Sequence, residues 1–355
     1  LTTVSLDGYG ATSTVSSDAL TTLNLANSAN DLVVTTTATT LALSLNNVAT
    51  GSTLDLGSSY TTLNLTTASK DSDVTLVAGG VQSLTVAGTN LVDLSGATLT
   101  ALKTVTVTGT AGLTINASGI NVTAVNTANT TGKVTADVDA DKATYTGGAG
   151  VDVVTLITTT VDNAVSTGAG NDTVTLATGT TALIANVSGG DDTDTLVMDA
   201  VNAATASAGI TFETFISGFE KLGLSTVTTN TVNLANMDDI SYVIAGATTA
   251  LTLTNMTNAG TLEITDANIA STLTMTDATG AADSFNIALN ATATTNVGTV
   301  AVTGVETINI TTADAEVVVA PTVQTANVYT MALTDAAAKT INVSGTQALV
   351  LTSAN

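Results

Sequence analysis

The sequence predicts an all-β fold: a parallel, right-handed β-helix or β-roll solenoid with about 20 residues per coil. Three observations lead to this prediction. A short apolar motif recurs at nearly constant spacing, valine and threonine dominate the runs between turns, and proline occurs once, at Pro321. β-Branched residues in short alternating runs favour strands, and strands that recur without an intervening helical period stack as parallel rungs.

The recurring motif sets the period of the predicted coils. Its copies include TTLNL at 21–25 and QSLTV at 82–86, and apolar and polar residues alternate within each copy. A strand with this alternation buries one face. We therefore expect the central apolar residues, 20 or 21 positions apart, to stack into one column: Leu23, Leu43, Leu63, Leu84, Val105, Val125, Tyr145 and Val165.

The second half of the chain is less regular, and we expect insertions in some of its loops. Its strand-sized segments are 219–225, 260–265, 283–289, 304–310 and 338–345. We expect Glu220 and Glu306, which open two of these segments, to face solvent on the outside of the coil. The chain then divides into regular coils at 1–145, glycine- and aspartate-rich coils at 146–200, and less regular coils at 201–355.

Charge and composition exclude several classes of function. The formal net charge is −23, with 29 acidic residues against six lysines, and histidine and cysteine are absent. A nucleic-acid-binding protein needs a basic face, and an anionic membrane would repel this chain. Without cysteine it has neither disulfides nor thiolate metal sites. Because no apolar run approaches the ~18 residues of a membrane span, we expect no direct membrane insertion. Because the chain is strongly acidic, we expect no nucleic-acid partner.

The residues that catalysis needs are also scarce. Arginine is absent, the six lysines are scattered, and the chain contains no nucleophile elbow, P-loop or zinc-ligand spacing. Solenoid enzymes that act on acidic polysaccharides need basic side chains to hold the sugar carboxylate. Tyrosines and carboxylates could serve as acid and base, but none cluster in the sequence. We therefore expect that the protein is not an enzyme.

Three glycine–aspartate turns lie between residues 147 and 197. They are GGAGVDVVT, TGAGNDTVT and GGDDTDTLV, and the first matches G-G-x-G-x-D-x-U-x, where U is a large apolar residue, at every specified position. Their aspartates are about one coil apart, so we expect them to stack along one edge of the solenoid. The candidate residues are Gly147, Gly148, Gly150, Asp152, Gly168, Gly170, Asp172, Gly189, Gly190, Asp192 and Asp194.

These turns carry the chemistry of calcium ligands. Glycine permits positive φ and lets backbone carbonyls approach a common point, and the aspartates add carboxylates. Calcium takes about six to eight oxygens, so two stacked turns can form a site and three turns suggest about two sites. The alternative is that the turns are only tight corners, but three copies in register favour calcium. At the third-glycine position of the last turn, Asp192 either adds a ligand or spoils the turn.

Two further groups of acidic residues are weaker candidates. In GAADSFNI, Asp283 follows a glycine and precedes an apolar strand, as in a degenerate calcium turn. Asp137, Asp139 and Asp141 occupy alternate positions, so in a strand they would share one exposed face. That face either binds a cation or is simply solvated, and we favour solvation because no glycine turn supports it.

On these motifs the chain resembles the RTX calcium-binding repeat proteins, which Gram-negative bacteria export by type I secretion. More narrowly, it is similar to RTX-type bacterial surface-layer (S-layer) proteins such as that of Caulobacter, through the blocks GGAGVD to FEKLGL and DATGAADSFNIAL to GVETINI. The similarity covers 140–310, whereas 1–140 share only composition and repeat character. It implies that 146–200 are RTX-like calcium-binding coils and that folding depends on Ca²⁺.

The resemblance also implies an extracellular structural protein whose copies assemble into a calcium-stabilised two-dimensional lattice on the cell surface. Its partners would be further copies of itself and lipopolysaccharide, the latter through parts outside this chain, because both ends look like cuts through a longer protein. The alternative is a stalk segment of a secreted RTX adhesin or biofilm-matrix protein, whose repeats would have the same chemistry. Ice binding is disfavoured because threonine does not recur at the same place in every coil.

Overall fold

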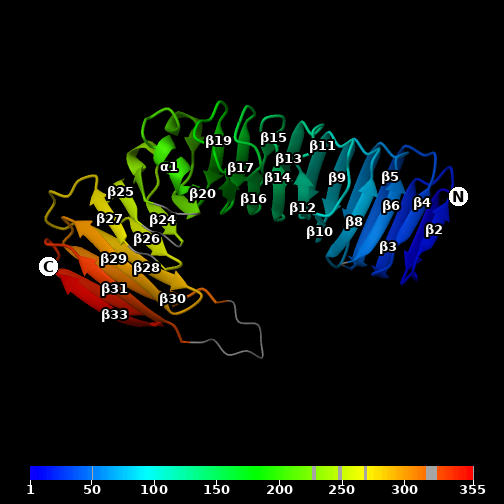
Figure 1. Cartoon of the computed structure of the whole chain (residues 1–355). Coiled ribbons are helices and arrows are strands. Elements are labelled where there is room, and N and C mark those ends of the chain that lie inside the picture. Colours follow the sequence, from blue (N-terminus) through cyan, green and yellow to red (C-terminus); the bar gives the residue numbers. More distant parts are fainter. Residues whose placement is uncertain (50, 226–228, 247–249, 268–269, 317–325, 355) are drawn as a thin grey trace. The chain divides into compact units, whose positions relative to one another are not determined.

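The computed structural model is an all-β parallel solenoid of about 16 turns, spaced about 21 residues apart, with 4% helix. The predicted fold class is confirmed. Strands that follow one another along the chain alternate between two series, so each turn contributes two strands rather than the one that the repeat predicted (Figure 1). The structure describes residues 1–49, 51–225, 229–246, 250–267, 270–316 and 326–354.

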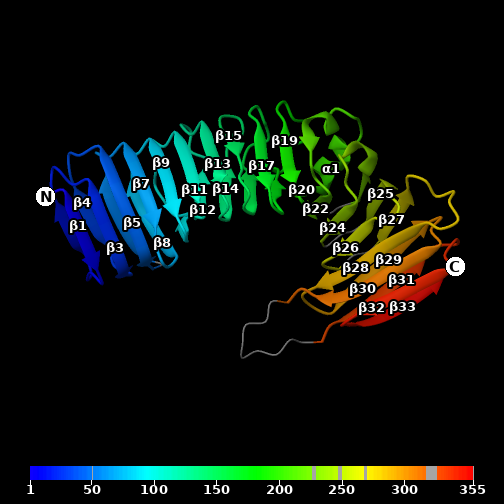
Figure 2. The same cartoon turned by 180° about the vertical axis from the view of Figure 1, so that it is seen from behind.

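The chain divides into two compact units. The first comprises residues 1–177 and 183–192, and the second comprises 178–182 and 193–355. Figure 2 shows the strands of each unit from the opposite side. The site considered below is built within single units, so each unit is described separately.

In the first unit, the odd-numbered strands form one parallel sheet and the even-numbered strands form parallel ladders beside it. The odd-numbered strands are β1 (Thr3–Asp7), β3 (Thr22–Ser28), β5 (Thr40–Val48), β7 (Thr62–Thr67), β9 (Ser83–Gly88), β11 (Thr104–Gly109), β13 (Ala124–Thr130), β15 (Thr144–Thr146), β17 (Val165–Ala169) and β19 (Val187–Asp191). The even-numbered strands are β2 (Ser13–Ser16), β4 (Leu32–Thr35), β6 (Ser52–Gly57), β8 (Ser72–Ala78), β10 (Leu91–Leu94), β12 (Gly112–Ala117), β14 (Val134–Val138), β16 (Asp152–Leu156) and β18 (Thr173–Thr175).

The second unit repeats this plan with longer connections. Its even-numbered strands are β20 (Thr195–Asp199), β22 (Lys221–Ser225), β24 (Tyr242–Ala245), β26 (Thr261–Ile264), β28 (Ser284–Ala291), β30 (Thr307–Asp314) and β32 (Thr340–Gly345). Its odd-numbered strands are β21 (Ile216–Ser217), β23 (Asn230–Asn233), β25 (Leu251–Met256), β27 (Ala270–Met275), β29 (Thr295–Thr303), β31 (Val328–Thr334) and β33 (Ala348–Ala354). The helical segments are α1 (Ala200–Ala206) and the 3₁₀ turns Glu213–Phe215 and Leu234–Asn236.

The strands predicted in the second half all belong to the even-numbered series. Helix α1 was not predicted, because seven residues rich in alanine give too short a window for a helical period. Its start is nevertheless marked in the sequence: the Asp199 carboxylate accepts a hydrogen bond from the Val201 N–H at 2.8 Å, as an N-cap does.

The predicted core column of the first unit forms, with one error in its register. Leu43 lies beside Leu65, and Leu41 lies beside Leu63, so this turn is two residues longer than the spacing predicted. A shift of two residues keeps the same face inward, and all four leucines are buried. The remaining pairs of the column form as predicted: Leu23 with Leu43, Leu63 with Leu84, Leu84 with Val105, Val105 with Val125, Val125 with Tyr145, and Tyr145 with Val165.

Replacing an inward residue of this column should destabilise the first unit far more than replacing its outward neighbour. Leu84 is fully buried, and Leu84→Ala should lower the free energy of unfolding by about 2–5 kcal/mol through lost burial and a residual cavity. The adjacent Thr85 alternates to the other face, so Thr85→Ala should change it by less than about 0.5 kcal/mol. Urea denaturation followed by circular dichroism measures both, and equal losses would contradict the assigned register.

Candidate metal centre

The predicted glycine–aspartate turns lead into consecutive even-numbered strands. Asp152 is the first residue of β16, Asp172 directly precedes β18, and Asp194 directly precedes β20. The first two belong to the first unit, and Asp194 belongs to the second. The candidate centre is therefore built here around Asp152 and Asp172.

Strand register places Asp152 among aliphatic side chains. Leu113 pairs with Val134, and Val134 pairs with Asp152, so the carboxylate occupies the inward position that leucine and valine hold in the two preceding turns. Asp152 is 0% exposed and Asp172 is 1% exposed. Two carboxylates on neighbouring rungs are thus withdrawn from water, which is costly unless a charge of opposite sign compensates them.

The two aspartates differ in their hydrogen bonding. Asp172 Oδ1 accepts a hydrogen bond of 2.7 Å from the backbone N–H of Asp152, which joins the two rungs. Within the described part of the chain, neither carboxylate oxygen of Asp152 has a hydrogen-bond partner of good geometry. Buried carboxylates normally accept several hydrogen bonds, so this side chain has unused ligand capacity.

The surroundings raise the pKa of both carboxyl groups above the ordinary aspartate value. Burial, followed by the nearby Asp172, raises the pKa of Asp152 to about 7, and contacts with Tyr145, the Gly148 backbone and Thr127 only partly offset this rise. Burial likewise raises the pKa of Asp172 to about 6. Burial, followed by the charge of Asp152, raises the pKa of Tyr145 well above its ordinary value. A bound cation would reverse the energetic cost of these charges.

The glycines serve two different purposes. A Cβ on Gly147 would lie 1.8 Å from the carbonyl oxygen of Thr167 and 2.5 Å from Asp152 Oδ2, so only glycine lets these groups pack together. Gly168 lies in the left-handed region, at φ +101°, and a Cβ there would also lie 2.2 Å from the carbonyl oxygen of Gly148. Both of the uses expected of these glycines, positive φ and the close approach of backbone groups, are found. Close approach alone accounts for Gly147, Gly148 and Gly150, whereas Gly168, Gly170 and Gly190 combine close approach with positive φ.

The third turn keeps its geometry despite Asp192. Gly168 pairs with Gly190, and Asp192 adopts φ +84°, a conformation that glycine would adopt without strain. Its Oδ2 accepts a hydrogen bond of 3.2 Å from the N–H of Gly170 in the preceding turn. Gly189 contributes its carbonyl, which accepts a bond of 2.6 Å from the Thr167 hydroxyl. Asp192 therefore does not spoil the turn.

The donor set of this corner suits a hard cation. Carboxylate, carbonyl and hydroxyl oxygens converge here, and such oxygens are the ligands that calcium prefers. In the described part of the chain, no three acidic side chains lie close enough together to hold a metal by themselves. Asp152 and Asp172 fit a calcium ion if backbone carbonyls of the glycine turns complete its shell, and these residues would then hold it.

Two glutamates occupy positions that sequence reasoning missed. Glu220 Oε2 accepts a hydrogen bond of 2.8 Å from the N–H of Asp194, and Glu306 Oε2 accepts one of 3.0 Å from the N–H of Asp283. The expectation that both glutamates simply face solvent is wrong, because each caps a backbone donor on the neighbouring rung. The available signal was their place directly before an apolar strand, which is also the place of the turn aspartates.

The three aspartates at alternate positions do not share a face. Strand β14 ends at Val138, so Asp137 points outward while Asp139 lies beyond the strand in a turn. Asp139 is 4% exposed, forms an ion pair with Lys142 and accepts a hydrogen bond from the N–H of Asp141. The prediction of one exposed carboxylate face is wrong because the period of a strand ends with the strand.

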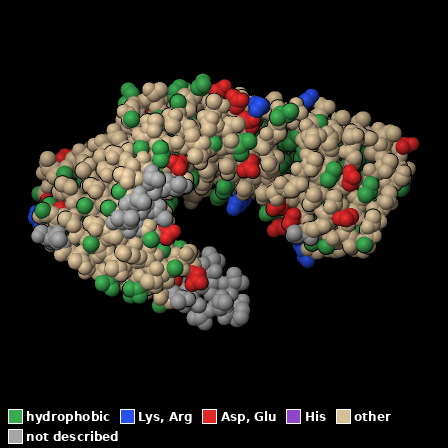
Figure 3. Space-filling view, viewed as in Figure 1, with side chains coloured by type: hydrophobic (Ala, Val, Ile, Leu, Met, Phe, Trp, Pro, Cys, Tyr) green, Lys and Arg blue, Asp and Glu red, His purple; other side chains and the backbone are tan. Residues whose placement is uncertain are grey.

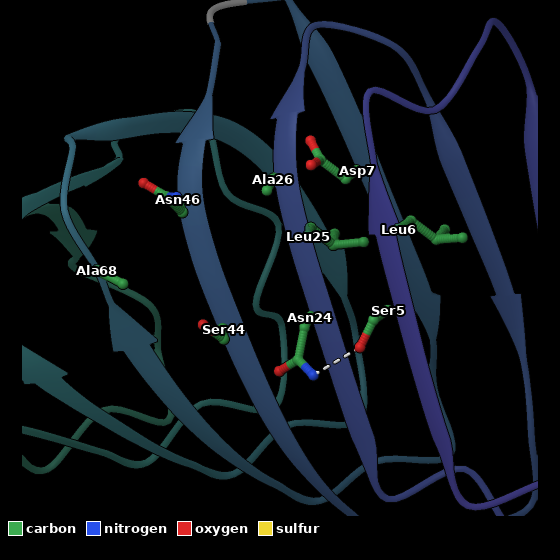
Figure 4. Close-up of a pocket in the computed structure, with 9 residues that line it drawn as sticks. All are labelled: Ser5, Leu6, Asp7, Asn24, Leu25, Ala26, Ser44, Asn46 and Ala68. Carbon is green, nitrogen blue, oxygen red and sulfur yellow. Dashed lines mark hydrogen bonds between the residues drawn. The ribbon is translucent and has the colours of Figure 1, made fainter.

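The first unit also has a hollow on its outer surface, over β1, β3, β5 and β7. Its volume is about 290 Å³, and Figure 4 shows the Asn24 amide donating to the Ser5 hydroxyl at 2.9 Å. Asp7 is the one titratable residue in its lining, and its Oδ1 accepts a hydrogen bond from Asn27. The lining thus offers neither an acid–base pair nor a nucleophile with a base.

No model of a known protein family matches the chain, and no curated protein sequence matches it significantly. In the described residues, no helix has the length and apolar character needed to cross a bilayer.

Gly147→Ala tests the close packing of the corner. The added methyl group would collide with backbone and with the Asp152 carboxylate, so we expect a loss of about 1–3 kcal/mol in the free energy of unfolding. Gly10→Ala is the matched control, because a Cβ there meets nothing within 4 Å. Thermal denaturation with and without calcium measures both variants, and a Gly147→Ala protein as stable as the control would contradict this geometry.

The raised pKa values predict an unusual pH dependence for the metal-free protein. Both folded-state values exceed the ordinary aspartate value of about 3.9, so between about pH 4 and pH 7 the folded state binds more protons than the unfolded state. The contribution of these two aspartates to the free energy of unfolding therefore decreases as the pH rises from about 4 to about 7.

Asp152→Val isolates the effect, because it restores the aliphatic residue that Val134 provides one rung earlier. Denaturation in EGTA across this pH range should show the variant gaining stability over the wild type as pH rises. Parallel pH profiles for the two proteins would refute the assignment.

Proposed function

We propose that this chain is the solenoid part of a self-assembling bacterial surface-layer protein whose turns are fastened by calcium. The observation that carries the calcium part is Asp152, a fully buried carboxylate that stands in an aliphatic column beside buried Asp172. Among the described residues, neither of its carboxylate oxygens has a hydrogen-bond partner of good geometry. Such a charge is tolerated when a cation compensates it. The resemblance to RTX-type surface-layer proteins supports the remainder of the proposal.

The charge of the chain supports calcium-dependent assembly. A net charge of −23 makes neighbouring copies repel each other, and divalent cations reduce that repulsion. On the face seen in Figure 3, acidic side chains are scattered over a largely uncharged surface, and basic side chains are few. Neutralised acidic surfaces of this kind are compatible with the close packing of identical copies in a lattice on the outside of the cell.

A structural rather than enzymatic role is supported by the sites themselves. The outward residues of the first unit include small polar side chains such as Asn24, Ser44 and Asn64, and its described hollow has no catalytic pair. Asp152 and Asp172, whose pKa values burial raises, lie within the corner. Buried there, they are placed to bind an ion rather than a large substrate.

The first test is a calcium titration with reversal by EGTA, in which circular dichroism and particle size are followed together. We expect calcium to increase ordered β-structure and to produce large assemblies, and EGTA to reverse both. Asp152→Asn with Asp172→Asn should weaken the response at least about tenfold in calcium concentration, because each change removes one negatively charged ligand and tenfold corresponds to only about 1.4 kcal/mol. The control is Asp137→Asn, an outward residue of β14, which should respond as the wild type does.

The assembled form distinguishes the lattice from the adhesin stalk. Electron microscopy of calcium-grown material should show two-dimensional sheets, whereas isolated fibres would favour the stalk. A protein that folds and assembles equally well in EGTA would reduce the glycine–aspartate turns to simple corners and remove the main support for the proposal.

A further inference from the structure

The second unit contains an acidic corner of its own, where Asp283 precedes β28 and Glu306 precedes β30. Asp283 is 8% exposed, and its Oδ2 is buried without a hydrogen-bond partner among the described residues. The N–H of Asp283 donates to Glu306 Oε2 at 3.0 Å. Asp283 thus has one shielded carboxylate oxygen with free acceptor capacity, and its backbone N–H is bound by a second carboxylate.

A glycine shapes this corner as Gly147 shapes the first. A Cβ on Gly280 would lie 2.7 and 2.8 Å from the two carboxylate oxygens of Asp283, so the carboxylate packs directly on the bare Cα. In both corners an acid on the next rung accepts the N–H of the buried aspartate: Asp172 for Asp152, and Glu306 for Asp283. The two corners therefore share a glycine, a buried aspartate and a bridging acid.

A lysine distinguishes the second corner from the first. Lys339 Nζ lies 3.8 Å from Glu306 Oε1, and the pairing of Thr307 with Thr340 places Lys339 one rung beyond Glu306. The lysine side chain is 69% exposed and that of Glu306 is 14% exposed. An exposed ammonium group is held weakly and can move away, so it reduces the negative potential of the corner without filling it.

We propose that Asp283 and Glu306 form a separate site for a hard divalent cation, with Lys339 acting as a competing positive charge. Carboxylate oxygens select hard cations such as calcium, and the single shielded aspartate with a nearby ammonium group makes this site weaker than the first. The site lies in the second unit, outside the turns at 147–197. It therefore stands or falls independently of the calcium site proposed above.

The test measures calcium binding to the whole chain by isothermal titration calorimetry. The double variant Asp152→Asn with Asp172→Asn removes the carboxylates of the first corner, and the binding that remains reports on the second. Adding Asp283→Asn or Glu306→Gln to this background should abolish that remaining binding. Asp277→Asn is the matched control, because its carboxylate is exposed and already accepts hydrogen bonds from Thr279.

Lys339→Gln supplies a second readout that loss of folding cannot imitate, because the expected change is a gain. Removing the competing charge should tighten the remaining site roughly two- to fivefold, as expected for the loss of an exposed charge pair. Circular dichroism confirms that each variant keeps its β-structure.

The outcomes separate this proposal from the proposed function. If the double variant binds no calcium, or if Asp283→Asn leaves its remaining binding unchanged, the second site is refuted. If the double variant binds as the wild type does and Asp283→Asn removes binding, the second site stands and the first fails. Unchanged affinity in Lys339→Gln would refute the competing role of the lysine.

Discussion

The constraint on which this structure depends is that each turn must place its inward positions over those of the turn before. The register between parallel strands fixes which residues of successive turns lie side by side. The surroundings of a residue therefore depend on the residues paired with it in neighbouring turns as much as on its sequence neighbours. Where the column is Leu113 and Val134, an aspartate at the next position becomes a buried charge. The candidate centre exists because Asp152 lies at an inward position, where the two preceding turns have aliphatic residues.

Acidic side chains serve this chain as backbone caps as well as surface charges. Their carboxylates accept hydrogen bonds from N–H groups of neighbouring turns, as Asp31 does from Thr53 and Asp71 does from Leu91. A parallel solenoid exposes such donors wherever a strand begins, and a carboxylate satisfies them more strongly than a neutral group does. This use explains why many acids of a strongly negative chain lie at corners rather than on strand faces.

The two proposed cation corners have the same local arrangement of residues but differ in their electrostatic surroundings. Each has a glycine that admits a carboxylate against its Cα, a buried aspartate and an acid on the next rung. In the first corner the column around Asp152 is aliphatic, and the nearby Asp172 adds to the cost of ionising Asp152. In the second corner Lys339 already supplies part of the neutralising charge. The physical difference lies in the charge already present before a metal binds.

The sequence by itself determined the fold class, most of the core column and the residues of the glycine–aspartate turns, because a repeat period and a two-residue alternation are properties of the chain alone. Tertiary structure decided the rest. The shift of Leu43 onto Leu65 depends on the length of one loop, and the second strand of each turn is stabilised by pairing across rungs. Only the stacked turns show that Asp152 is inward, that Glu220 and Glu306 cap backbone N–H groups, and that Asp139 leaves the strand. Each of these facts concerns residues about 20 or more positions apart or the point where a strand ends, and local sequence preference contains neither.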